Sequence, residues 1–368
     1  MRLLVVNAGS SSVKISVLDE QDNLVASHNV PSPGGQVDQD ALREVVKKAG
    51  PFDAVGHRIV HGGTEFTAPV LVDPNVERRL EALTDLAPLH QPKSLQGLRA
   101  VSGLLPGLPT VACFDTAFHA TIPPAAHTYA LPPQWRRRWE LRRYGFHGLS
   151  HAYASRRARE LMGLAPGAPF RVVTCHLGSG ASLAAVRDGT SVDTTMGFTP
   201  LEGLVMGTRS GSVDPGLLLW LEEHVGMPPA ELASTLEHRS GLFGLTGTSD
   251  MRSVLEAESA GDPDAALAMQ VYLHRLKGSI ASMVAALAGF DALVFTGGVG
   301  EHSAPVRQRA CAGLRFLGAE LDEALNLEEA DGDRELSASA TRARIFVIEA
   351  REDKEIARGV RAVLRAGG

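Results

Sequence analysis

The chain opens with the stretch LLVVNAGSSSVKISVL at residues 3–18. Two apolar runs, residues 3–6 and 13–18, flank a turn of small residues, and this pattern predicts two strands joined by a hairpin. Small side chains leave the backbone N–H groups of the turn open, and Lys14 adds one positive charge just beyond it. The stretch therefore predicts a strand–turn–strand unit whose turn can hold an anion such as a phosphate.

The pattern returns 169 residues later as VVTCHLGSGASLAAVRDG at residues 172–189. In this alignment Asn7 falls on His176, Gly9 on Gly178, Ser10 on Ser179, Val17 on Val186 and Asp19 on Asp188. One Gly-Ser hairpin is common in α/β proteins, but two in register at a domain-sized offset indicate a duplication. We therefore expect two similar domains whose turns face each other.

Length and composition limit the class of protein. A chain of 368 residues exceeds the size at which one hydrophobic core usually keeps growing, so two domains are expected. Hydrophobic residues make up 44% of the chain and charged residues 21%, as in ordinary globular proteins. The net charge of -6 is spread without long runs, whereas a nucleic-acid surface needs a concentrated basic patch. We therefore expect small-molecule partners and no nucleic acid.

Neither the cysteines nor the apolar runs indicate a secreted or membrane protein. Cys113, Cys175 and Cys311 are too scattered for a disulfide framework or a zinc site. The first residues lack the apolar run of a signal peptide. Residues 280–295 are apolar but contain a serine and an aspartate, which favours a buried helix and strand over a membrane span. We therefore expect a cytoplasmic protein with no membrane partner.

Two strand ends and one long loop carry polar candidates. A strand from residue 54 ends in HRIVHGG at 57–63, and a strand at 110–114 is followed by Asp115. Ligands in α/β proteins bind at such strand ends. The loop at 193–215 is rich in Gly, Thr and Ser and contains Arg209, and a loop of this length is usually functional.

The domain boundary is expected at the connection after the basic run 136–143, a run that we interpret as a solvated face. The first domain is then 1–148, closed by a C-terminal helix at 353–368. The second domain is 149–352 and binds the nucleotide.

Four glycine-rich turns, at Gly9, Gly178, 244–247 and 297–300, could cradle phosphates, because glycine lets a backbone approach closely. The sequence has no Gly-Lys dipeptide and therefore no P-loop. It also lacks the Gly-x-Ser-x-Gly and His-Glu-x-x-His motifs, and no Gly-x-Gly-x-x-Gly follows its first strand. These features favour a nucleotide site that is built from several glycine-rich turns and is neither a P-loop nor a dinucleotide-binding motif.

Six runs, spread in order over nearly the whole chain, closely resemble the acetate kinase family: NAGSSSVK (7–14), HRIVHGG (57–63), FDTAFH (114–119), RYGFHG (143–148), MGFTPLEG (196–203) and GTRSG (207–211). The resemblance implies an α/β fold of two duplicated actin-like (ribonuclease H-like) domains that face each other across a nucleotide cleft. The repeat described above agrees with this fold independently.

The resemblance also implies a reaction. The γ-phosphoryl group of ATP would be transferred reversibly and directly in line to acetate, giving acetyl phosphate and ADP, with Mg²⁺, or Mn²⁺ in its place. A homodimer is expected from the family. A propionate or butyrate kinase and a catalytically silent ATP-binding clamp are the alternatives. A sugar kinase would need a catalytic aspartate as base, for which Asp115 is the candidate.

The implied catalytic residues are Asp115, His147 and Arg209, with Arg58 as the ligand of the carboxylate or acyl phosphate. A planar guanidinium matches two oxygens, and charge on the transferred phosphoryl group must be neutralised. The family assigns Asp115 as proton donor or acceptor, yet a carboxylate substrate is already ionised at neutral pH. Asp115 could instead orient Arg58 or a magnesium-bound water. Either arginine could instead be a structural ion-pair partner, although both lie in matching motifs.

By resemblance, Asn7 and Glu352 hold the metal. The match near Glu352 is weak, so Glu349 or Asp353 could share this role. The pocket for the acyl group is expected from Val60, Leu89, Phe146 and Pro200. Such a pocket gives a preference for acetate rather than an exclusion of propionate. His90 is either a further phosphate contact or an ordinary loop histidine.

The implied nucleotide contacts are Lys14, His176, Leu177, Gly178, Ser179, Gly180, Asp250, Met251, Arg252, Gly298, Val299, Gly300, Glu301 and His302. Ser179 and His302 stand where the family usually has Asn. Both departures lie at the nucleotide, so they leave the preferred phosphoryl donor open rather than the reaction type.

Overall fold

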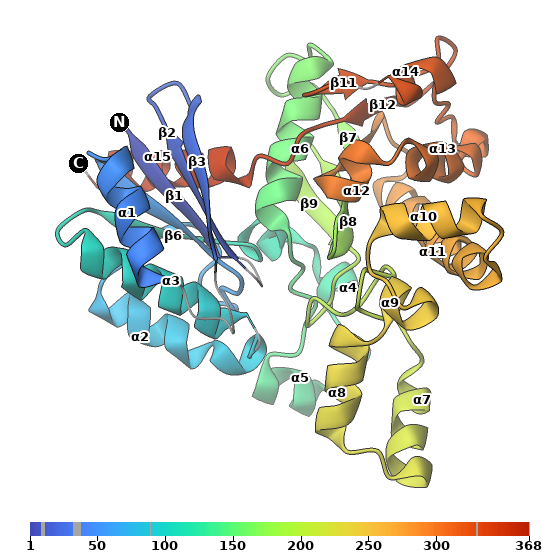
Figure 1. The fold of residues 1–368 in the computed structure, drawn as a ribbon, viewed down its shortest axis with the longest axis horizontal. Coiled ribbons are helices and arrows are strands. Elements are labelled where there is room, and N and C mark those ends of the chain that lie inside the picture. The colour runs from blue at the N-terminus through green and yellow to red at the C-terminus, as the bar shows by residue number, and fades with distance from the viewer. Residues whose placement is uncertain (9–11, 32–37, 89, 329, 368) are drawn as a thin grey trace. The chain divides into compact units, whose positions relative to one another are not determined.

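The computed structural model describes residues 1–8, 12–31, 38–88, 90–328 and 330–367, which form two compact units (Figure 1). The first unit comprises Met1–Ala120, Phe146–Tyr153 and Arg351–Gly368. The second comprises Thr121–Gly145 and Ala154–Ala350. Helix α6 (Gly148–Leu161) begins in the first unit and continues into the second. None of the helices in the described ranges is long and apolar enough to cross a membrane.

The first unit contains a six-stranded sheet in the order β3-β2-β1-β4-β6-β5. Its strands are β1 (Leu3–Ala8), β2 (Ser12–Leu18), β3 (Leu24–Pro31), β4 (Ala54–Ile59), β5 (Val70–Leu71) and β6 (Thr110–Phe114). Its helices are α1 (Gln39–Ala49), α2 (Pro74–Ala82), α3 (Gln91–Leu104) and α15 (Glu352–Ala366), with 3-10 turns at Thr84–Leu86 and Ala117–Thr121. Strands β1, β4 and β6 run parallel, so their carboxyl ends share one edge.

The second unit repeats this strand order as β9-β8-β7-β10-β12-β11. The strands are β7 (Arg171–Leu177), β8 (Ala181–Arg187), β9 (Thr190–Thr194), β10 (Ala292–Thr296), β11 (Arg334–Glu335) and β12 (Arg344–Val347). The helices are α4 (Pro124–His127), α5 (Pro133–Trp139), α7 (Pro215–Trp220), α8 (Pro229–His238), α9 (Gly241–Thr246), α10 (Met251–Ser259), α11 (Pro263–Leu287), α12 (Gly297–His302), α13 (Ala304–Ala312) and α14 (Glu323–Leu327). A π-helical turn at Leu221–Val225 follows α7, and a 3-10 turn lies at Arg315–Leu317. The expected duplicated α/β fold is confirmed, whereas the facing of the two domains stays a prediction.

The strand pairing corrects the alignment of the two repeats. Ala8 pairs with Val13, but Leu177 pairs with Ala181, so the second turn is one residue shorter. After the turn the offset between the repeats is therefore 168 residues, and Val17 corresponds to Ala185 rather than to Val186. Both repeats then carry a β-bulge at the same place, after Val17 and after Ala185. By the same offset, Asp19 corresponds to Arg187 rather than to Asp188.

Strand β1 is buried on both faces of the first sheet, which explains its continuous apolar run. Leu3 and Val5 pack with Ile356 and Val360 of α15 in one core cluster. The alternate residues of β1 pack in a second cluster with residues of α1 and α3. The C-terminal helix therefore closes one face of this sheet, as the sequence predicts.

The proposed domain boundary at residue 148 differs from the observed division, because residues 121–145 belong to the second unit. Hydrogen bonds explain this assignment. Thr121 Oγ1 donates to Ser191 O, and Arg143 Nη1 donates to Thr195 O and Met196 O, each at 3.0 Å. The segment is thus attached to β9 and to the loop that follows it.

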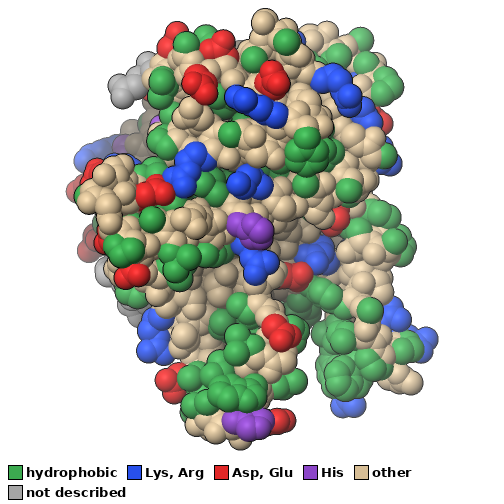
Figure 2. Space-filling view, turned by 90° about the vertical axis from the view of Figure 1, so that its right-hand side faces the viewer, with side chains coloured by type: hydrophobic (Ala, Val, Ile, Leu, Met, Phe, Trp, Pro, Cys, Tyr) green, Lys and Arg blue, Asp and Glu red, His purple; other side chains and the backbone are tan. Residues whose placement is uncertain are grey.

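Helix α7 and its surroundings expose large apolar side chains, which include Val213, Leu217, Leu219, Trp220 and Val225. Figure 2 shows hydrophobic side chains gathered at the lower end of the face that it presents, the end at which α7 lies in Figure 1. Exposed apolar side chains gathered on one face are typical of a protein interface.

Gly56 allows α15 to approach the centre of the first sheet. A Cβ atom at this position would lie 2.6 Å from Ile356 Cγ2 and 2.8 Å from Val360 Cγ2. We expect Gly56→Ala to lower the free energy of unfolding by about 1–3 kcal/mol, as overpacking does. The matched control is Gly103→Ala, because a Cβ there has no atom within 4 Å apart from its chain neighbours and the backbone of its own helix, and helix α3 favours alanine. Urea unfolding that ranks the two variants in the opposite order would contradict the prediction.

Candidate functional site

The first unit brings Arg58 and Asp115 together at the carboxyl ends of β4 and β6. These strands are parallel neighbours, and Arg58 lies opposite Cys113 in their register. Arg58 Nε donates to both carboxylate oxygens of Asp115 at 3.0 Å, and Nη2 also donates to Oδ2. The Asp115 side chain is fully buried and that of Arg58 is 15% exposed. Two residues predicted from separate motifs therefore form one buried ion pair.

The expected metal ligands lie beside this pair. Asn7 Nδ2 donates to Glu352 Oε2 at 2.6 Å, which joins the end of β1 to the first residue of α15. Arg58 Nη1 lies 3.4 Å from Asn7 Oδ1 and 3.2 Å from Ala8 O, and its Nε lies 4.0 Å from Glu352 Oε2. Asn7, Arg58, Asp115 and Glu352 thus form one polar cluster, here called the Arg58 cluster.

The charges of the Arg58 cluster set its protonation. Burial opposes the positive charge of Arg58, but Asp115 and Glu352 outweigh it and raise the pKa of the guanidinium. Burial also raises the pKa of the Asp115 carboxyl, against the opposing effects of Arg58 and of the His147 backbone N–H. Arg58 therefore stays cationic over the working pH range, with one edge of its guanidinium facing Asp115.

His147 is tied to the same cluster through its backbone. Its N–H donates to the Asp115 carboxylate, and the next N–H, of Gly148, donates to Asp115 O at 2.9 Å. His147 has a φ of 54°, a left-handed conformation that is uncommon for a residue with a side chain. A Cβ at Gly148 would collide with Asp115 O, so the approach requires glycine. The candidate catalytic histidine is therefore fixed at the end of β6.

The expected acyl-pocket residues lie in different parts of the chain. Val60 and Phe146 are buried in the first unit. Phe146 O accepts a hydrogen bond from His119 Nε2 at 3.0 Å, and the Phe146 ring meets that of His61 edge-on at 5.6 Å. Leu89 lies outside the described residues, as do Gly9, Ser10 and Ser11 of the first turn. Pro200 belongs to the second unit.

Three buried histidines of the first unit make stability depend on pH. Burial lowers the pKa of His57 to about 3 and the pKa values of His61 and His119 to about 4, from 6.5. Below pH 6.5 the unfolded chain therefore binds more protons than the folded one. Stability is full above this pH and falls as the pH falls, by up to about 1.4 kcal/mol per pH unit for each histidine.

His57 allows a test, because its Nε2 is buried without a hydrogen-bond partner among the described residues. We expect His57→Leu to reduce the number of protons taken up on unfolding, and with it the slope of unfolding free energy against pH, by up to about one proton as the pH falls from 6.5 toward about 3. Urea unfolding at several pH values measures this slope. An unchanged slope would show that His57 does not enter the folded state as a neutral group.

The donor set of the Arg58 cluster fits a hard divalent cation. Mg²⁺ takes oxygen ligands and binds to one or two protein groups together with phosphates and water. The Glu352 carboxylate and the Asn7 amide oxygen supply such atoms within one hydrogen-bonded pair. Asp353 instead pairs with Arg351, with Nε to Oδ1 at 2.9 Å. No group of three or more His, Cys, Asp or Glu suited to a metal occurs among the described residues.

Arg209 lies in the second unit, on the long loop between β9 and α7. Its Nε donates to Glu237 Oε1 at 2.8 Å, and its Nη1 donates to Pro200 O at 3.3 Å. Two residues expected at the reaction centre, Arg209 and Pro200, are therefore in contact. The Arg209 side chain is 18% exposed, and that of Glu237 is 12% exposed.

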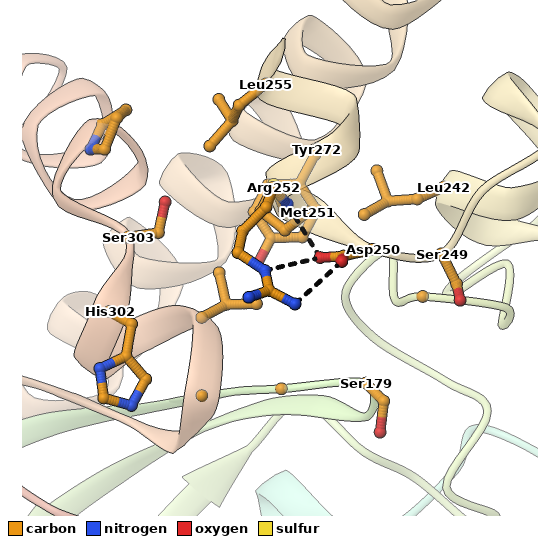
Figure 3. Close-up of a pocket in the computed structure, with 15 residues that line it drawn as sticks. Ser179, Leu242, Ser249, Asp250, Met251, Arg252, Leu255, Tyr272, His302 and Ser303 are labelled. Carbon is orange, nitrogen blue, oxygen red and sulfur yellow. Dashed lines mark hydrogen bonds and ion pairs between the residues drawn. The ribbon is translucent and has the colours of Figure 1, made fainter. Parts of the chain in front are cut away.

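A cavity of about 480 Å³ in the second unit has the size of a small-molecule site. It is lined by Gly178, Ser179, Gly207, Leu242, Ser249, Asp250, Met251, Arg252, Leu255, Tyr272, Gly298, Val299, His302, Ser303 and Pro305. Figure 3 shows Ser179 and His302 on two sides of the cavity, with the Arg252 and Asp250 pair above them in this view. Arg252 Nη2 lies 3.1 Å from Asp250 Oδ2, and this pair lowers the pKa of Asp250.

Most of the expected nucleotide residues line this cavity: Gly178, Ser179, Asp250, Met251, Arg252, Gly298, Val299 and His302. The other expected residues of the second unit are not among the lining residues: His176, Leu177, Gly180, Gly300 and Glu301. Glu301 Oε1 instead accepts from the backbone of Gly297 and Ala350, at 2.8 and 2.9 Å. Lys14 is exposed on β2 of the first unit.

Comparison with known proteins identifies the family. The family model described as the acetokinase family matches residues 34–358. The chain belongs to the acetokinase family. The family consists of phosphotransferases, so the chain is a kinase. An acetate kinase of Streptomyces coelicolor is 44% identical over 399 residues, covering 100% of this chain and 98% of that protein. An acetate kinase of Thermotoga maritima is 40% identical over 403 residues and is covered completely.

Solved structures of the acetokinase family agree over the full length. Porphyromonas gingivalis acetate kinase has a TM-score of 0.90 at 37% identity, with 99% of each chain covered. A propionate kinase from Francisella tularensis has a TM-score of 0.88 at 33% identity, with 97% of this chain and 98% of that chain covered. The fold of the family is therefore shared by proteins named for different acyl substrates.

Sequence reasoning missed several residues of the cavity in this family member. Leu242 and Ser249 lie in the glycine-rich passage 241–250, whose composition gave a general signal but no particular residue. Tyr272 belongs to the buried stripe of α11, where a core role and a cavity wall have the same periodicity. Glu237 gave no signal, because an acidic residue near a helix end resembles a solvated one.

Proposed function

We propose that this chain is an acetate kinase, which transfers the γ-phosphoryl group of ATP to acetate and releases acetyl phosphate and ADP in a reversible, Mg²⁺-dependent reaction. The observation that carries the proposal is the Arg58 cluster, in a chain that matches acetate kinases over its full length. A cationic fork beside two oxygen ligands is suited to an acid anion and a phosphate-bound metal.

Arg58 would bind the substrate carboxylate by one edge of its guanidinium. Asp115 occupies the edge formed by Nε and Nη2. A substrate anion therefore approaches the edge formed by Nη1 and Nη2, where Nη1 otherwise contacts Ala8 O and Asn7 Oδ1. This geometry supports a role for Asp115 in orienting Arg58, because a carboxylate substrate needs no base to become a nucleophile.

Arg209 and His147 would neutralise charge on the phosphoryl group during in-line transfer. Phosphoryl transfer needs positioning and electrostatic stabilisation more than covalent chemistry. Arg209 supplies a guanidinium whose charge does not depend on pH. The backbone of His147 is held by its hydrogen bond to Asp115, so the point from which its side chain extends is fixed beside Asp115.

Asn7 and Glu352 would hold the metal through the amide oxygen and the carboxylate. When bound, Mg²⁺, or Mn²⁺ in its place, neutralises phosphate charge and orients the phosphate oxygens. The apolar lining of Leu242, Met251 and Leu255 offers a slot for a nucleotide base. Lys14 is proposed as a phosphate contact, and Ser179 and His302 as residues that affect the choice of phosphoryl donor.

A homodimer and a cytoplasmic location complete the proposal. The exposed apolar surface around α7 supports an interface between two copies of the chain. The free, buried state of Cys113, Cys175 and Cys311 agrees with a reducing compartment. Light scattering of the purified protein measures the oligomeric state, and a monomer at micromolar concentration would contradict the dimer.

The decisive experiment traps acyl phosphate with hydroxylamine under saturating ATP and magnesium. Initial rates with acetate, propionate and butyrate are compared, and acetate is expected to give the highest kcat/KM. One methylene changes transition-state binding by about 1–3 kcal/mol, so propionate is expected to react more slowly but measurably. Propionate kinase is the second candidate because of the similarity to the Francisella tularensis structure. No hydroxamate with any of the three acids would contradict the proposal and favour a silent ATP-binding clamp.

A further inference from the structure

Glu237 is a charged group that contacts the side chain of Arg209. Its Oε1 accepts the Nε–H of Arg209 at 2.8 Å, and both side chains are largely buried. Nε is the part of the guanidinium nearest the aliphatic stem, so a carboxylate there fixes the plane of the whole fork. Pro200 O holds Nη1 at 3.3 Å from a second direction.

The backbone around Arg209 is attached to the same end of α8. Ser210 N donates to Leu236 O at 3.0 Å, and Thr208 Oγ1 donates to Glu237 O at 2.9 Å. Ser240 N donates to Thr208 O at 2.9 Å. Arg209 is therefore flanked on both sides by hydrogen bonds to residues 236–240.

Gly241 lets the turn after α8 pack closely against the backbone of the loop that carries Arg209. It has a φ of 62°, and a Cβ there would lie 2.6 Å from Arg209 O and would also collide with Met206 O. Leu242 N donates to Met206 O at 2.9 Å. The turn between α8 and α9 is thus in contact with the backbone of the loop that carries Arg209.

We propose that Glu237 is a positioning residue that sets the orientation of the Arg209 guanidinium before phosphoryl transfer. The proposal rests on the proposed function, in which Arg209 stabilises the transferred phosphoryl group. Arg209 stands on a loop without regular secondary structure and has four rotatable side-chain bonds. An arginine in that setting would lose much rotamer freedom on reaching its reactive orientation. The fixed carboxylate of Glu237 restricts the Arg209 side chain before the substrates bind. The hydrogen bonds between the loop and α8 keep this carboxylate opposite the guanidinium.

The test compares Glu237→Ala and Glu237→Gln with the unaltered protein in the hydroxamate assay. For Glu237→Ala we expect kcat to fall by about 10²-fold, the effect of a misplacement of about 1 Å, with KM for ATP nearly unchanged. Glu237→Gln keeps an oxygen that accepts the same hydrogen bond. Its kcat is therefore expected to lie between that of Glu237→Ala and that of the unaltered protein. If the unaltered protein forms no hydroxamate, the proposed function is refuted, and this inference is refuted with it.

A cycle with Arg209→Ala separates positioning from a structural effect. If Glu237 acts through Arg209, then Glu237→Ala adds no further loss of kcat in the Arg209→Ala background. Glu231→Ala is the matched control, because it removes an exposed carboxylate of the same helix, 3.9 Å from Arg239, and should leave kcat unchanged. Multiplicative losses in the double variant, or a kcat in Glu237→Ala equal to or above that of the unaltered protein, would overturn the proposal.

Discussion

Replacement of Arg209 by alanine is expected to lower kcat for acetyl phosphate formation by roughly 10³-fold or more, the scale of an arginine that stabilises a transferred phosphoryl group. The Arg209 side chain is 18% exposed, and its guanidinium donates hydrogen bonds to Glu237 and to Pro200 O. Because the lost interaction belongs to the transition state, kcat should fall more than KM rises. Steady-state rates with ATP and acetate measure both constants.

A folded variant is needed for that comparison, which circular dichroism and thermal unfolding establish. Arg239→Ala is the matched control, because this nearby arginine at the end of α8 is exposed and its partners are Thr235 and Glu231 of α8. We expect its kcat to equal that of the unaltered protein. A loss below tenfold in folded Arg209→Ala would remove Arg209 from the reaction centre.

Much of the fold could be predicted because its signals are local. The strand at 110–114 was predicted to the residue, and the duplicated hairpins predicted two similar domains, which the repeated strand order of the two sheets confirms. The register of the repeats was wrong after the turn, because turn length is set by backbone hydrogen bonds that leave little trace in Gly-Ser sequences. The short helix α12 was predicted as a turn, since Gly297-Gly298-Val299-Gly300 has a low helix propensity.

The candidate site divides in the same way. Motifs identified Arg58 and Asp115, but their ion pair depends on the adjacency of two strands that are far apart in the sequence. The hydrogen bond between Asn7 and Glu352 joins residues separated by 345 positions and is likewise a product of the tertiary fold. Glu237 could not be found, because neither periodicity nor a motif distinguishes a buried carboxylate at a helix end from an exposed one.

Replacement of Arg58 by methionine is expected to remove activity and to lower the free energy of unfolding by about 3–5 kcal/mol. The second effect arises because the fully buried Asp115 loses its countercharge, and removal of one partner of a buried pair leaves the other uncompensated. Urea unfolding measures the stability, and the hydroxamate assay measures the activity. Because this single variant loses both stability and activity, a second variant is needed to separate the structural role of Arg58 from its role as substrate ligand.

The double variant Arg58→Met/Asp115→Leu separates the two roles. Apolar side chains that replace a buried ion pair are often neutral or stabilising, so we expect most of the lost stability to return. The hydrogen bond between Asn7 and Glu352 does not involve either altered residue and should persist. Activity should remain absent, because no guanidinium is left to receive the substrate carboxylate. A stable double variant that phosphorylates acetate would contradict the role of Arg58 as substrate ligand, whereas a stable and inactive one would assign the loss to catalysis.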